Sequence, residues 1–384
     1  MQFEFATAAK IVFGAGKINS IGTLIEDYGN RVLIITGAPQ SISEKLLNLL
    51  NLSEANRCLI KIDNEPTVAV VREVVERARK ISTNLVIGIG GGSALDTSKA
   101  TAALLTNPGD VTDYLEVAGL NKPLIHPSLP LIAIPTTSGT GSEVTRNAVI
   151  GSPLHHVKVS LRSHHLLPRI ALIDPELTIS VPPCITASTG LDALTQLIEP
   201  FTSNSPNPLT DALCLEGIRR VAHSLSQAYD YGKDLHARED MSLASLFSGL
   251  ALANAKLGAV HGLAGPIGGQ IPAPHGAICA SLLPHVMAAN ISALTDRYPD
   301  YPSLERYAMV GRLLSGNPDA NAETAIQWVQ NFCLHAKIQS LSTFGLTESH
   351  FSTIIEKSLK ASSMKGNPIT LTENELRNIL QRSL

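Results

Sequence analysis

The sequence lacks the features that would assign it to several special classes of protein. Its five cysteines are odd in number and scattered, with no CxxC pair, which argues against a disulfide framework and fits reduced thiols. The net charge is −3 at pH 7, so no basic surface for nucleic acid is predicted. No apolar run reaches membrane-spanning length, and the start MQFEFATAAK has neither the basic residues nor the apolar core of a signal peptide. We therefore expect a cytoplasmic protein with no nucleic-acid or membrane partner.

What the sequence does contain is typical of a folded protein with two domains. The chain has 384 residues, 44% of them hydrophobic and 16% charged, with no internal repeat or low-complexity segment. A single hydrophobic core stops growing at about 250–300 residues, so a chain of this length is expected to divide.

The first half alternates short apolar runs with helical patterns. Strands are predicted at 32–36, 58–62, 85–89, 131–134 and 170–173, and amphipathic helices lie between the early ones. Strands separated by helices at this spacing predict a doubly wound, mostly parallel sheet. The fold class is therefore an α/β dinucleotide-binding domain at the N-terminus.

The pattern changes near Val181-Pro182-Pro183, after which β-branched runs disappear. Helices are predicted at 187–200, 209–227, 239–263, 276–291, 304–314, 323–336, 348–359 and 372–382. We therefore predict a nucleotide-binding domain over residues 1–183 and an all-α domain over residues 184–384. A site would be expected in a cleft between them.

A glycine-rich turn follows the third predicted strand, in the sequence GIGGGSALDTSK from Gly88 to Lys99. Glycines let backbone N–H groups approach a phosphate, and the helix that begins at once adds partial positive charge. A tight turn would need one glycine rather than three in succession, so pyrophosphate binding is favoured. The motif is not GxGxxG, so it is not a standard Rossmann fingerprint.

A second polar loop follows the strand at 131–134, in the sequence PTTSGTGSEVT. Its hydroxyl groups and two glycines come directly after a buried strand. Such a loop at the carboxyl end of a strand suits ribose and phosphate contacts, although a solvated loop would have the same composition.

Two histidines stand out in NAKLGAVHGLAGPIGGQIPAPHG, because a rigid Gly/Pro-rich break separates His261 from His275. Asp192 and Gln196 lie four residues apart on a predicted helix that Ser188 could cap. An aspartate in a helix otherwise full of Leu, Ile and Ala needs a partner. This set of side chains could hold a divalent cation, or it could be two satisfied histidines and a solvated carboxylate.

Five motifs together resemble the iron-containing (group III) alcohol dehydrogenase family. They are GGGSALDTSK, PTTSGTGSEVT, LIDPELT, GLDALTQLIE and NAKLGAVHGLAGPIGG…PHG, in this order, over about Phe13 to Pro284. The resemblance implies an NAD(P)-dependent oxidoreductase of small carbonyl or alcohol substrates, assembled as a homodimer or a larger homo-oligomer. It further implies the two-domain fold predicted above.

The resemblance also implies roles for individual residues. Asp192, His261 and His275 match three of four metal ligands and are the candidate catalytic residues, and Gln196 stands at the fourth ligand position. The candidate cofactor-binding residues are Gly37, Gly90, Gly91, Gly92, Ser93, Asp96, Lys99, Thr136, Thr137, Ser138, Thr140 and Lys158.

Three positions depart from the family's pattern. Gln196 replaces a histidine ligand, Gly265 replaces a histidine implicated in proton transfer, and Gly37 replaces an acidic residue that often ends the first strand. A neutral amide is a poor ligand beside imidazole, so zinc, iron, a weakly held ion and no metal all stay open. Alternative functions are a metal-independent oxo-acid reductase, similar to maleylacetate reductase, and a non-catalytic nucleotide-binding protein.

Overall fold

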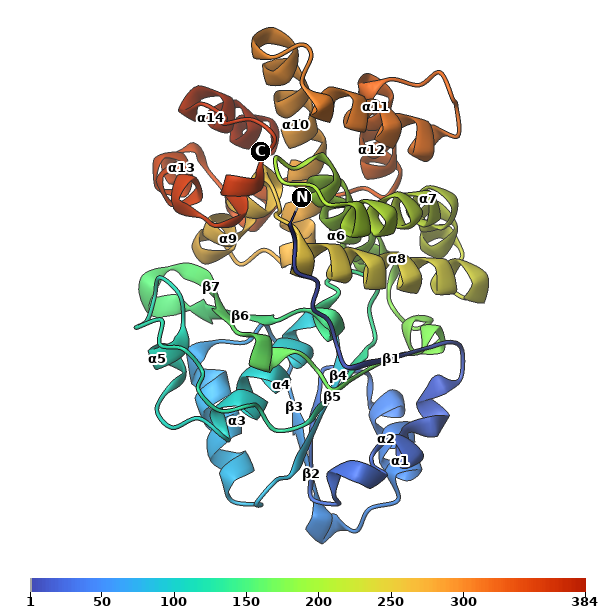
Figure 1. Ribbon diagram of the computed structural model, residues 1–384, viewed down its shortest axis with the longest axis vertical. Coiled ribbons are helices and arrows are strands. Elements are labelled where there is room, and N and C mark those ends of the chain that lie inside the picture. Colours follow the sequence, from blue (N-terminus) through green and yellow to red (C-terminus); the bar gives the residue numbers. More distant parts are fainter. Residues whose placement is uncertain (1) are drawn as a thin grey trace. The chain divides into compact units, whose positions relative to one another are not determined.

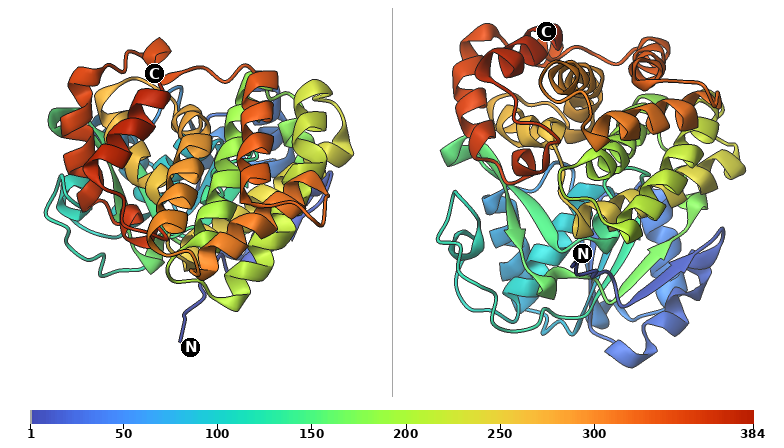
Figure 2. Two further views of the ribbon diagram at one scale, coloured as in Figure 1. Left: turned by 90° about the horizontal axis from the view of Figure 1, so that it is seen from above. Right: turned by 45° about the horizontal axis from the view of Figure 1, so that its top comes forward.

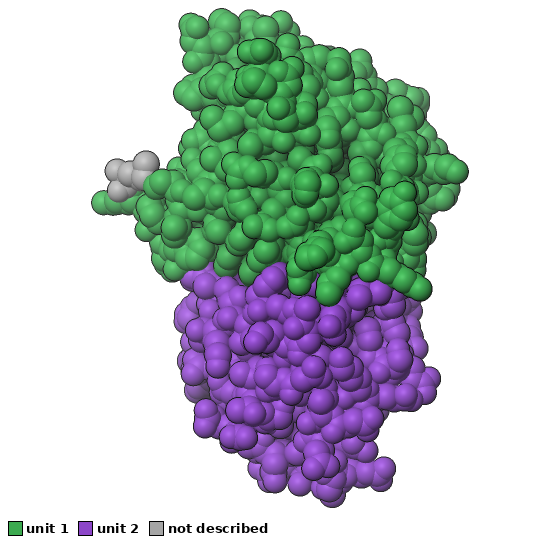
Figure 3. All heavy atoms as spheres, turned by 90° about the vertical axis from the view of Figure 1, so that its right-hand side faces the viewer, with its two compact units in different colours: residues 1–5, 138–140, 181–384 green, residues 6–137, 141–180 purple. Residues whose placement is uncertain are grey.

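The computed structural model describes residues 2–384 and divides into two compact units, coloured separately in Figure 3. The α/β unit comprises Ala6–Thr137 and Gly141–Ser180. The helical unit comprises Ser138–Thr140 and Val181–Leu384, with the N-terminal residues up to Phe5. The chain thus changes unit at residue 181, where the sequence analysis placed the division after residue 183. Residues 138–140, inside the predicted nucleotide loop, belong to the helical unit, and nothing in the composition of the loop indicates this.

The α/β unit is built on a parallel sheet, as the strand and helix pattern predicted (Figure 1). One of its six strands, Lys10–Phe13, was not predicted. The order is β1-β8-β5-β4-β2-β3, and every pair is parallel. The strands are β1 (Lys10–Phe13), β2 (Val32–Thr36), β3 (Arg57–Lys61), β4 (Leu85–Gly90), β5 (Leu131–Pro135) and β8 (Ile170–Ile173).

Helices cover both faces of this sheet, which is why its central strands read as continuous apolar runs. They are α1 (Ile21–Leu24), α2 (Gln40–Leu50), α3 (Val68–Arg79) and α4 (Gly92–Leu104). The short α5 (Val111–Tyr114) packs in a separate cluster with α3 and α4. Val32 and Ile34 of β2 pack in the core with α1 and α2, whereas Leu33 and Ile35 pack with α3 and α4. Each such fully buried side chain contributes about 1.5–3 kcal/mol of hydrophobic stabilisation.

A separate antiparallel hairpin, β6 (Asn147–Ser152) with β7 (Val157–Arg162), was not predicted. Short 3-10 turns complete the unit at Lys17–Ser20, Glu26–Tyr28, Glu54–Asn56, Ser142–Val144, Pro153–His155, His164–Leu166 and Pro175–Thr178.

The helical unit carries α6 to α14, seen from two further directions in Figure 2. They are α6 (Pro183–Thr202), α7 (Pro208–Asp230), α8 (Leu235–Asn254), α9 (Ala259–Gln270), α10 (His275–Arg297), α11 (Pro302–Ser315), α12 (Ala322–His335), α13 (Phe351–Lys360) and α14 (Glu373–Arg382), with 3-10 turns at Leu341–Phe344, Glu348–His350 and Ser363–Gly366. The all-α prediction is confirmed.

Two local predictions in this unit are wrong. The helix expected over 239–263 is two helices, α8 and α9, which meet at 93° across residues 255–258. The helix expected over 187–200 begins earlier, at Pro183, because proline is well suited to the first position of a helix. Ser188 therefore lies inside α6 and does not cap it.

One helix in the described part of the chain, α10, is long and apolar enough to cross a membrane by length and composition. The bent pair of α8 and α9 passes the same test together. This corrects the expectation that no segment reaches that length. In the structure 61% of the apolar window of α10 is buried, as in the core helix of a globular protein.

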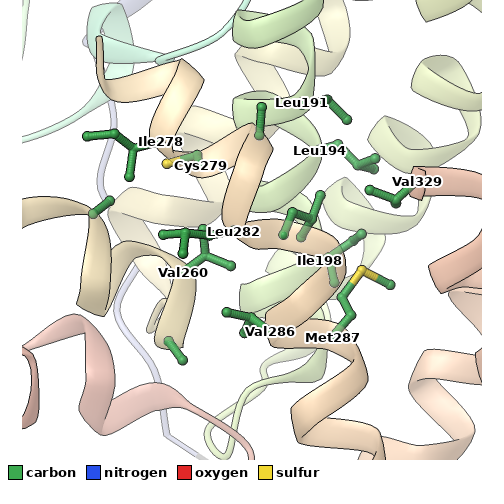
Figure 4. Close-up of a cluster of buried hydrophobic side chains, with 14 of the residues drawn as sticks. Leu191, Leu194, Ile198, Val260, Ile278, Cys279, Leu282, Val286, Met287 and Val329 are labelled. Carbon is green, nitrogen blue, oxygen red and sulfur yellow. The ribbon is translucent and has the colours of Figure 1, made fainter. Parts of the chain in front are cut away.

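A shared apolar core aligns the three helices that carry the predicted metal ligands. Leu194 and Ile198 of α6, Val260 of α9, and Ile278 and Leu282 of α10 belong to one buried cluster, drawn in Figure 4. Packing against common neighbours fixes how these helices face one another. The polar residues opposite these apolar ones are therefore held in defined positions.

Candidate active site

Asp192 occupies a polar strip on α6 that the apolar core does not reach. Its side chain is 1% exposed, and its Oδ2 accepts a hydrogen bond of 3.0 Å from Gln196 Nε2, one turn later. The Oε1 of Gln196 lies 3.0 Å from the Ser248 hydroxyl oxygen. Because a carboxylate only accepts hydrogen bonds, Asp192 requires the amide nitrogen of Gln196 to point towards it. The amide oxygen of Gln196 therefore faces Ser248 and not Asp192.

Glu199 is a candidate site residue that the sequence analysis missed. Its Oε2 lies 2.7 Å from His261 Nδ1, and its Oε1 accepts the backbone N–H of Val260 at 2.6 Å. Both partners lie in the first turn of α9, so one carboxylate caps this helix and orients the histidine. With Nδ1 donating to Glu199, the Nε2 lone pair of His261 is left to act as a ligand. The available signal was spacing, since 192, 196 and 199 share one helix face.

His275 is the first residue of α10, and a close helix contact sets its place. A Cβ on the next residue, Gly276, would lie 3.0 Å from the carbonyl oxygen of Ser188. Glycine therefore lets the start of α10 approach α6 one turn from Asp192. The His275 side chain is 35% exposed, so it is the ligand through which a small molecule could reach the cluster.

The structure brings Asp192, His261 and His275 together with Cys279, which the sequence analysis did not single out. One ligand atom from each lies within 4.8 Å of the others. Asp192 Oδ1 is 3.6 Å from His261 Nε2 and 3.8 Å from His275 Nε2. All of these residues belong to the helical unit. Where the cluster lies relative to the GGGS turn stays a prediction.

Two buried atoms in this cluster test whether a cation fits. Among residues 2–384, Asp192 Oδ1 and His261 Nε2 find no hydrogen-bond partner. Leaving a buried polar atom unsatisfied costs about 1–3 kcal/mol, and more for a charged group. A carboxylate oxygen and imidazole nitrogens are donors that zinc and iron accept. The residues therefore fit a divalent cation, and Asp192, His261 and His275 would hold it.

The electrostatics of the cluster also favour positive charge. Burial lowers the pKa of His261, but Glu199 and Asp192 outweigh it and raise the pKa to about 10. Burial raises the pKa of Asp192, but His275 and His261 outweigh it and the pKa is lowered. Two buried carboxylates beside imidazole thus create a site for a positive charge, which a proton or a metal cation can supply.

The second predicted site lies in the α/β unit, where the strand order changes direction. After β2, the chain places β3 on one side of β2 in the sheet and then β4 on its other side. Gly37 follows β2, Gly90 ends β4, and the N–H of Gly37 donates to the carbonyl of Ile89 at 2.9 Å. Dinucleotides bind outside the carboxyl ends of strands at such a switch point. This topology brings Gly37 and the GGGS turn side by side.

Gly90 is the position in the turn where a side chain is excluded. Its φ is +149°, and a Cβ there would lie 2.9 Å from both the Gly37 backbone nitrogen and Ala94 Cβ. α4 begins two residues later, and no side chain caps its N-terminus. Its first N–H groups and the helix dipole are therefore available to an anion, which fits a pyrophosphate. Gly91, Gly92 and Ser93 lie at this helix start.

Asp96 and Lys99, predicted to bind the cofactor, are engaged within the α/β unit. Asp96 accepts from Ser142 Oγ at 2.6 Å and from the Val149 N–H at 2.9 Å. Lys99 is fully buried, and its Nζ contacts Thr145 and the Asn147 carbonyl. These contacts tie α4 to β6 and to the loop before it. Direct cofactor binding by either residue stays a prediction.

The remaining predicted cofactor residues are placed as follows. Thr136 is buried, its N–H donates to the Gly90 carbonyl at 3.0 Å, and Thr137 lies beside Gly91. Ser138 and Thr140 belong to the helical unit, where the Ser138 hydroxyl is 3.2 Å from that of Ser242. Lys158, on β7, forms an ion pair with Glu65.

Comparison with known proteins covers nearly the whole chain. Residues 8–175 match the family model "Iron-containing alcohol dehydrogenase", and residues 186–384 match "Fe-containing alcohol dehydrogenase family, C-terminal". Among curated relatives, 1,3-propanediol dehydrogenase of Klebsiella pneumoniae is 35% identical, with 100% of this chain and 99% of the relative covered. NAD-dependent methanol dehydrogenase of Bacillus methanolicus is 31% identical, with 97% of each covered.

Solved structures agree. Alcohol dehydrogenase from Oenococcus oeni is similar with a TM-score of 0.90 and 31% identity, covering 100% of both chains. The two family models thus span a chain that has the fold, the glycine turn and the cluster of candidate ligand side chains. The protein belongs to the iron-containing alcohol dehydrogenase family and is an alcohol oxidoreductase.

Proposed function

We propose that the protein interconverts a small aldehyde or ketone and its alcohol, using NADP or NAD and a divalent cation held by Asp192, His261 and His275. The observation that supports this most directly is the pair of buried atoms Asp192 Oδ1 and His261 Nε2, which lie 3.6 Å apart next to His275 and have no hydrogen-bond partner. The named relatives act on small alcohols, methanol and 1,3-propanediol. The family implies a nicotinamide cofactor and a divalent metal, typically iron.

Several residues of the chain would have separate roles in this reaction. The cation would supply Lewis acidity to the alcohol or carbonyl oxygen, and the nicotinamide would exchange the hydride. Glu199 fixes the tautomer of His261, and Gln196 orients Asp192. His275, the more exposed ligand, borders the place where the substrate oxygen would lie. Gly265 leaves no imidazole at the position implicated in proton transfer.

We also propose that NADPH is accepted at least as well as NADH. An acidic residue at the end of an early strand bonds the ribose 2′-hydroxyl and repels a 2′-phosphate. Here Gly37 follows β2, and Gln40 and Ser41 are exposed at the start of α2, with no carboxylate among residues 37–41. A kcat/KM for NADH a hundredfold above that for NADPH would contradict this proposal.

The decisive experiment measures metal content and turnover together. Protein stripped by a chelator and reloaded with Zn²⁺ or Fe²⁺ is assayed for NADPH and NADH oxidation with small aldehydes, ketones, and 2-oxo and 4-oxo acids. We expect turnover of aldehydes that depends on the reloaded ion. Full activity on oxo acids without metal would instead support the metal-independent reductase. Cofactor binding without any turnover would support a non-catalytic nucleotide-binding protein.

Two further properties are proposed on the resemblance alone. We expect a cytoplasmic protein and a homodimer or larger homo-oligomer. Light scattering of the purified protein measures the oligomeric state directly.

A further inference from the structure

Cys279 lies where a fourth metal ligand is needed. It is one turn after His275 on α10, so the two side chains share a helix face. The residue is fully buried and is labelled in the apolar cluster of Figure 4. Its Sγ is 3.6 Å from His275 Nε2. It also belongs to the group whose ligand atoms lie within 4.8 Å of one another.

Three of the six separations among the four ligand atoms are close to the edges of a tetrahedral site. Zinc–sulfur and zinc–nitrogen distances of about 2.3 and 2.0 Å at a tetrahedral angle place sulfur and nitrogen ~3.5 Å apart. The Cys279–His275 separation of 3.6 Å is close to this value. The two Asp192 separations, 3.6 and 3.8 Å, are a few tenths longer than the ~3.4 Å expected between oxygen and nitrogen ligands. A small inward shift of Asp192 would close them.

Gln196 does not compete for this place. Its amide nitrogen points at Asp192 Oδ2 and its oxygen lies against Ser248. Turning the amide over would set its oxygen against the carboxylate, which both partners disfavour because neither then donates. In this arrangement Gln196 orients Asp192 and leaves the cation without a fourth donor from α6.

We propose that the Cys279 thiolate is the fourth ligand of the divalent cation, in place of the imidazole that is missing at position 196. Binding displaces the thiol proton of Cys279 and the proton that His261 Nε2 carries in the metal-free protein, and it releases both to solvent. The charges of Asp192 and Cys279 then balance the two positive charges of the metal. A set of one carboxylate, two imidazoles and one thiolate is softer than the carboxylate and imidazole set of the family, so it favours zinc over iron.

Spectroscopy of the loaded protein tests this directly, and the inference rests on the proposed function. In Co²⁺-loaded wild type we expect a thiolate-to-cobalt charge-transfer band in the near ultraviolet. In Zn²⁺-loaded protein, X-ray absorption should show one sulfur at about 2.3 Å. Cys279→Ala and Cys279→Ser should both lack the sulfur signal and hold Zn²⁺ about 10- to 100-fold more weakly in chelator competition.

The matched control is Cys333→Ser, which changes a half-buried thiol of the same unit outside the cluster. It should keep both the sulfur signal and the affinity. Metal bound at Asp192 with only oxygen and nitrogen ligands, or unchanged affinity in Cys279→Ala, overturns the inference and leaves the proposed function standing. Wild type that binds no divalent ion contradicts both.

Discussion

The two candidate sites are made of different material. The turn after β4 is made of backbone, and it works because side chains are absent: a Cβ on Gly90 would meet the backbone of Gly37 at 2.9 Å. The cluster in the helical unit is made of side chains from α6, α9 and α10. Its departures from the family's pattern, Gln196 and Gly265, are exchanges of one side chain for another. A backbone site fails when anything is added, whereas a side-chain site can recruit a neighbour such as Cys279.

The two units also bury carboxylates differently. Burial raises the pKa of Glu143, in the predicted nucleotide loop, to about 7, and the charge of Lys99 only partly opposes this. The pKa of Asp192 is instead lowered, because two imidazoles outweigh its burial. The α/β unit therefore contains a carboxyl group with a pKa near 7, whereas the helical unit places its carboxylate beside groups that carry a positive charge.

The largest effect should come from removing the charge at the centre of the side-chain cluster. Asp192→Ala and the isosteric Asp192→Asn should lose the cation and lower kcat/KM about 10³-fold or more, because Lewis acidity contributes several kcal/mol. Metal content per chain and steady-state rates measure this. Asp192→Asn can keep a hydrogen bond to Gln196, so its folding is the control. Unchanged turnover in a metal-free variant would contradict the prediction.

The backbone site should break at Gly90, where a side chain has no room. Gly90→Ala forces a Cβ into the Gly37 backbone at positive φ, and we expect cofactor affinity to fall about 100-fold. Gly151→Ala, on β6, is the matched control, because its Cβ would meet the Pro66 carbonyl oxygen at an ordinary 3.5 Å. Titration of nicotinamide fluorescence measures both. Equal effects at the two positions would argue against the geometry of this turn.

Glu143 should make the α/β unit sensitive to pH. A carboxyl group with a pKa raised from 4.5 to about 7 contributes stability below pH ~4.5 that is lost as the pH rises through ~7. Relative to Glu143→Gln, the free energy of unfolding of wild type should fall by about 3 kcal/mol over this window. Denaturant unfolding at several pH values measures the difference. The exposed Glu73→Gln is the control and should leave the wild-type profile unchanged.

Glu199 should act on metal binding through His261. Glu199→Gln keeps a polar group beside His261 and removes the charge, so we expect 10- to 100-fold weaker metal binding, as is typical when an outer carboxylate is lost. Chelator competition measures the affinity, and helix content from circular dichroism reports on α9. Unaltered affinity would mean that the hydrogen bond matters and the charge does not.

The smallest expected effect concerns cofactor choice. Gly37→Asp places a carboxylate after β2 and should shift the NADH to NADPH ratio of kcat/KM about tenfold towards NADH. A Cβ at residue 37 would meet Ala94 at 3.3 Å, so some local adjustment is needed. Gly37→Ala carries that adjustment without the charge and should leave the ratio unchanged. Equal shifts in both variants would assign the effect to sterics.

The sequence predicted what periodicity and burial determine. Strands such as Val32–Thr36 were found because both faces are covered, which makes the run continuously apolar. The break at 255–258 was missed because Leu257 and Val260 continue the helical spacing across it. The side-chain oxygens of Glu199 and Asn367, from distant parts of the chain, accept hydrogen bonds from the first N–H groups of α9 at this break.

The three candidate ligands were predicted together, but the residues around them were not. Asp192, His261 and His275 carried a motif, whereas Glu199 looked like the end of an apolar helix and Cys279 like one scattered thiol. Both stand at helical spacing from a predicted ligand, Glu199 seven residues after Asp192 and Cys279 four after His275. That spacing becomes informative only once the helices are known to face one another.

The hydrogen bonds that Glu199 accepts from α9 determine the direction in which the side chains of that helix point. Each residue turns a helix by about 100°, so a start one position later would carry His261 about a quarter of a turn or more away from Asp192. Glu199 accepts from the Val260 N–H and from His261 together, which the chain can satisfy in only one register. The Glu199 carboxylate thus fixes where α9 begins, and the start of the helix determines where the His261 side chain points.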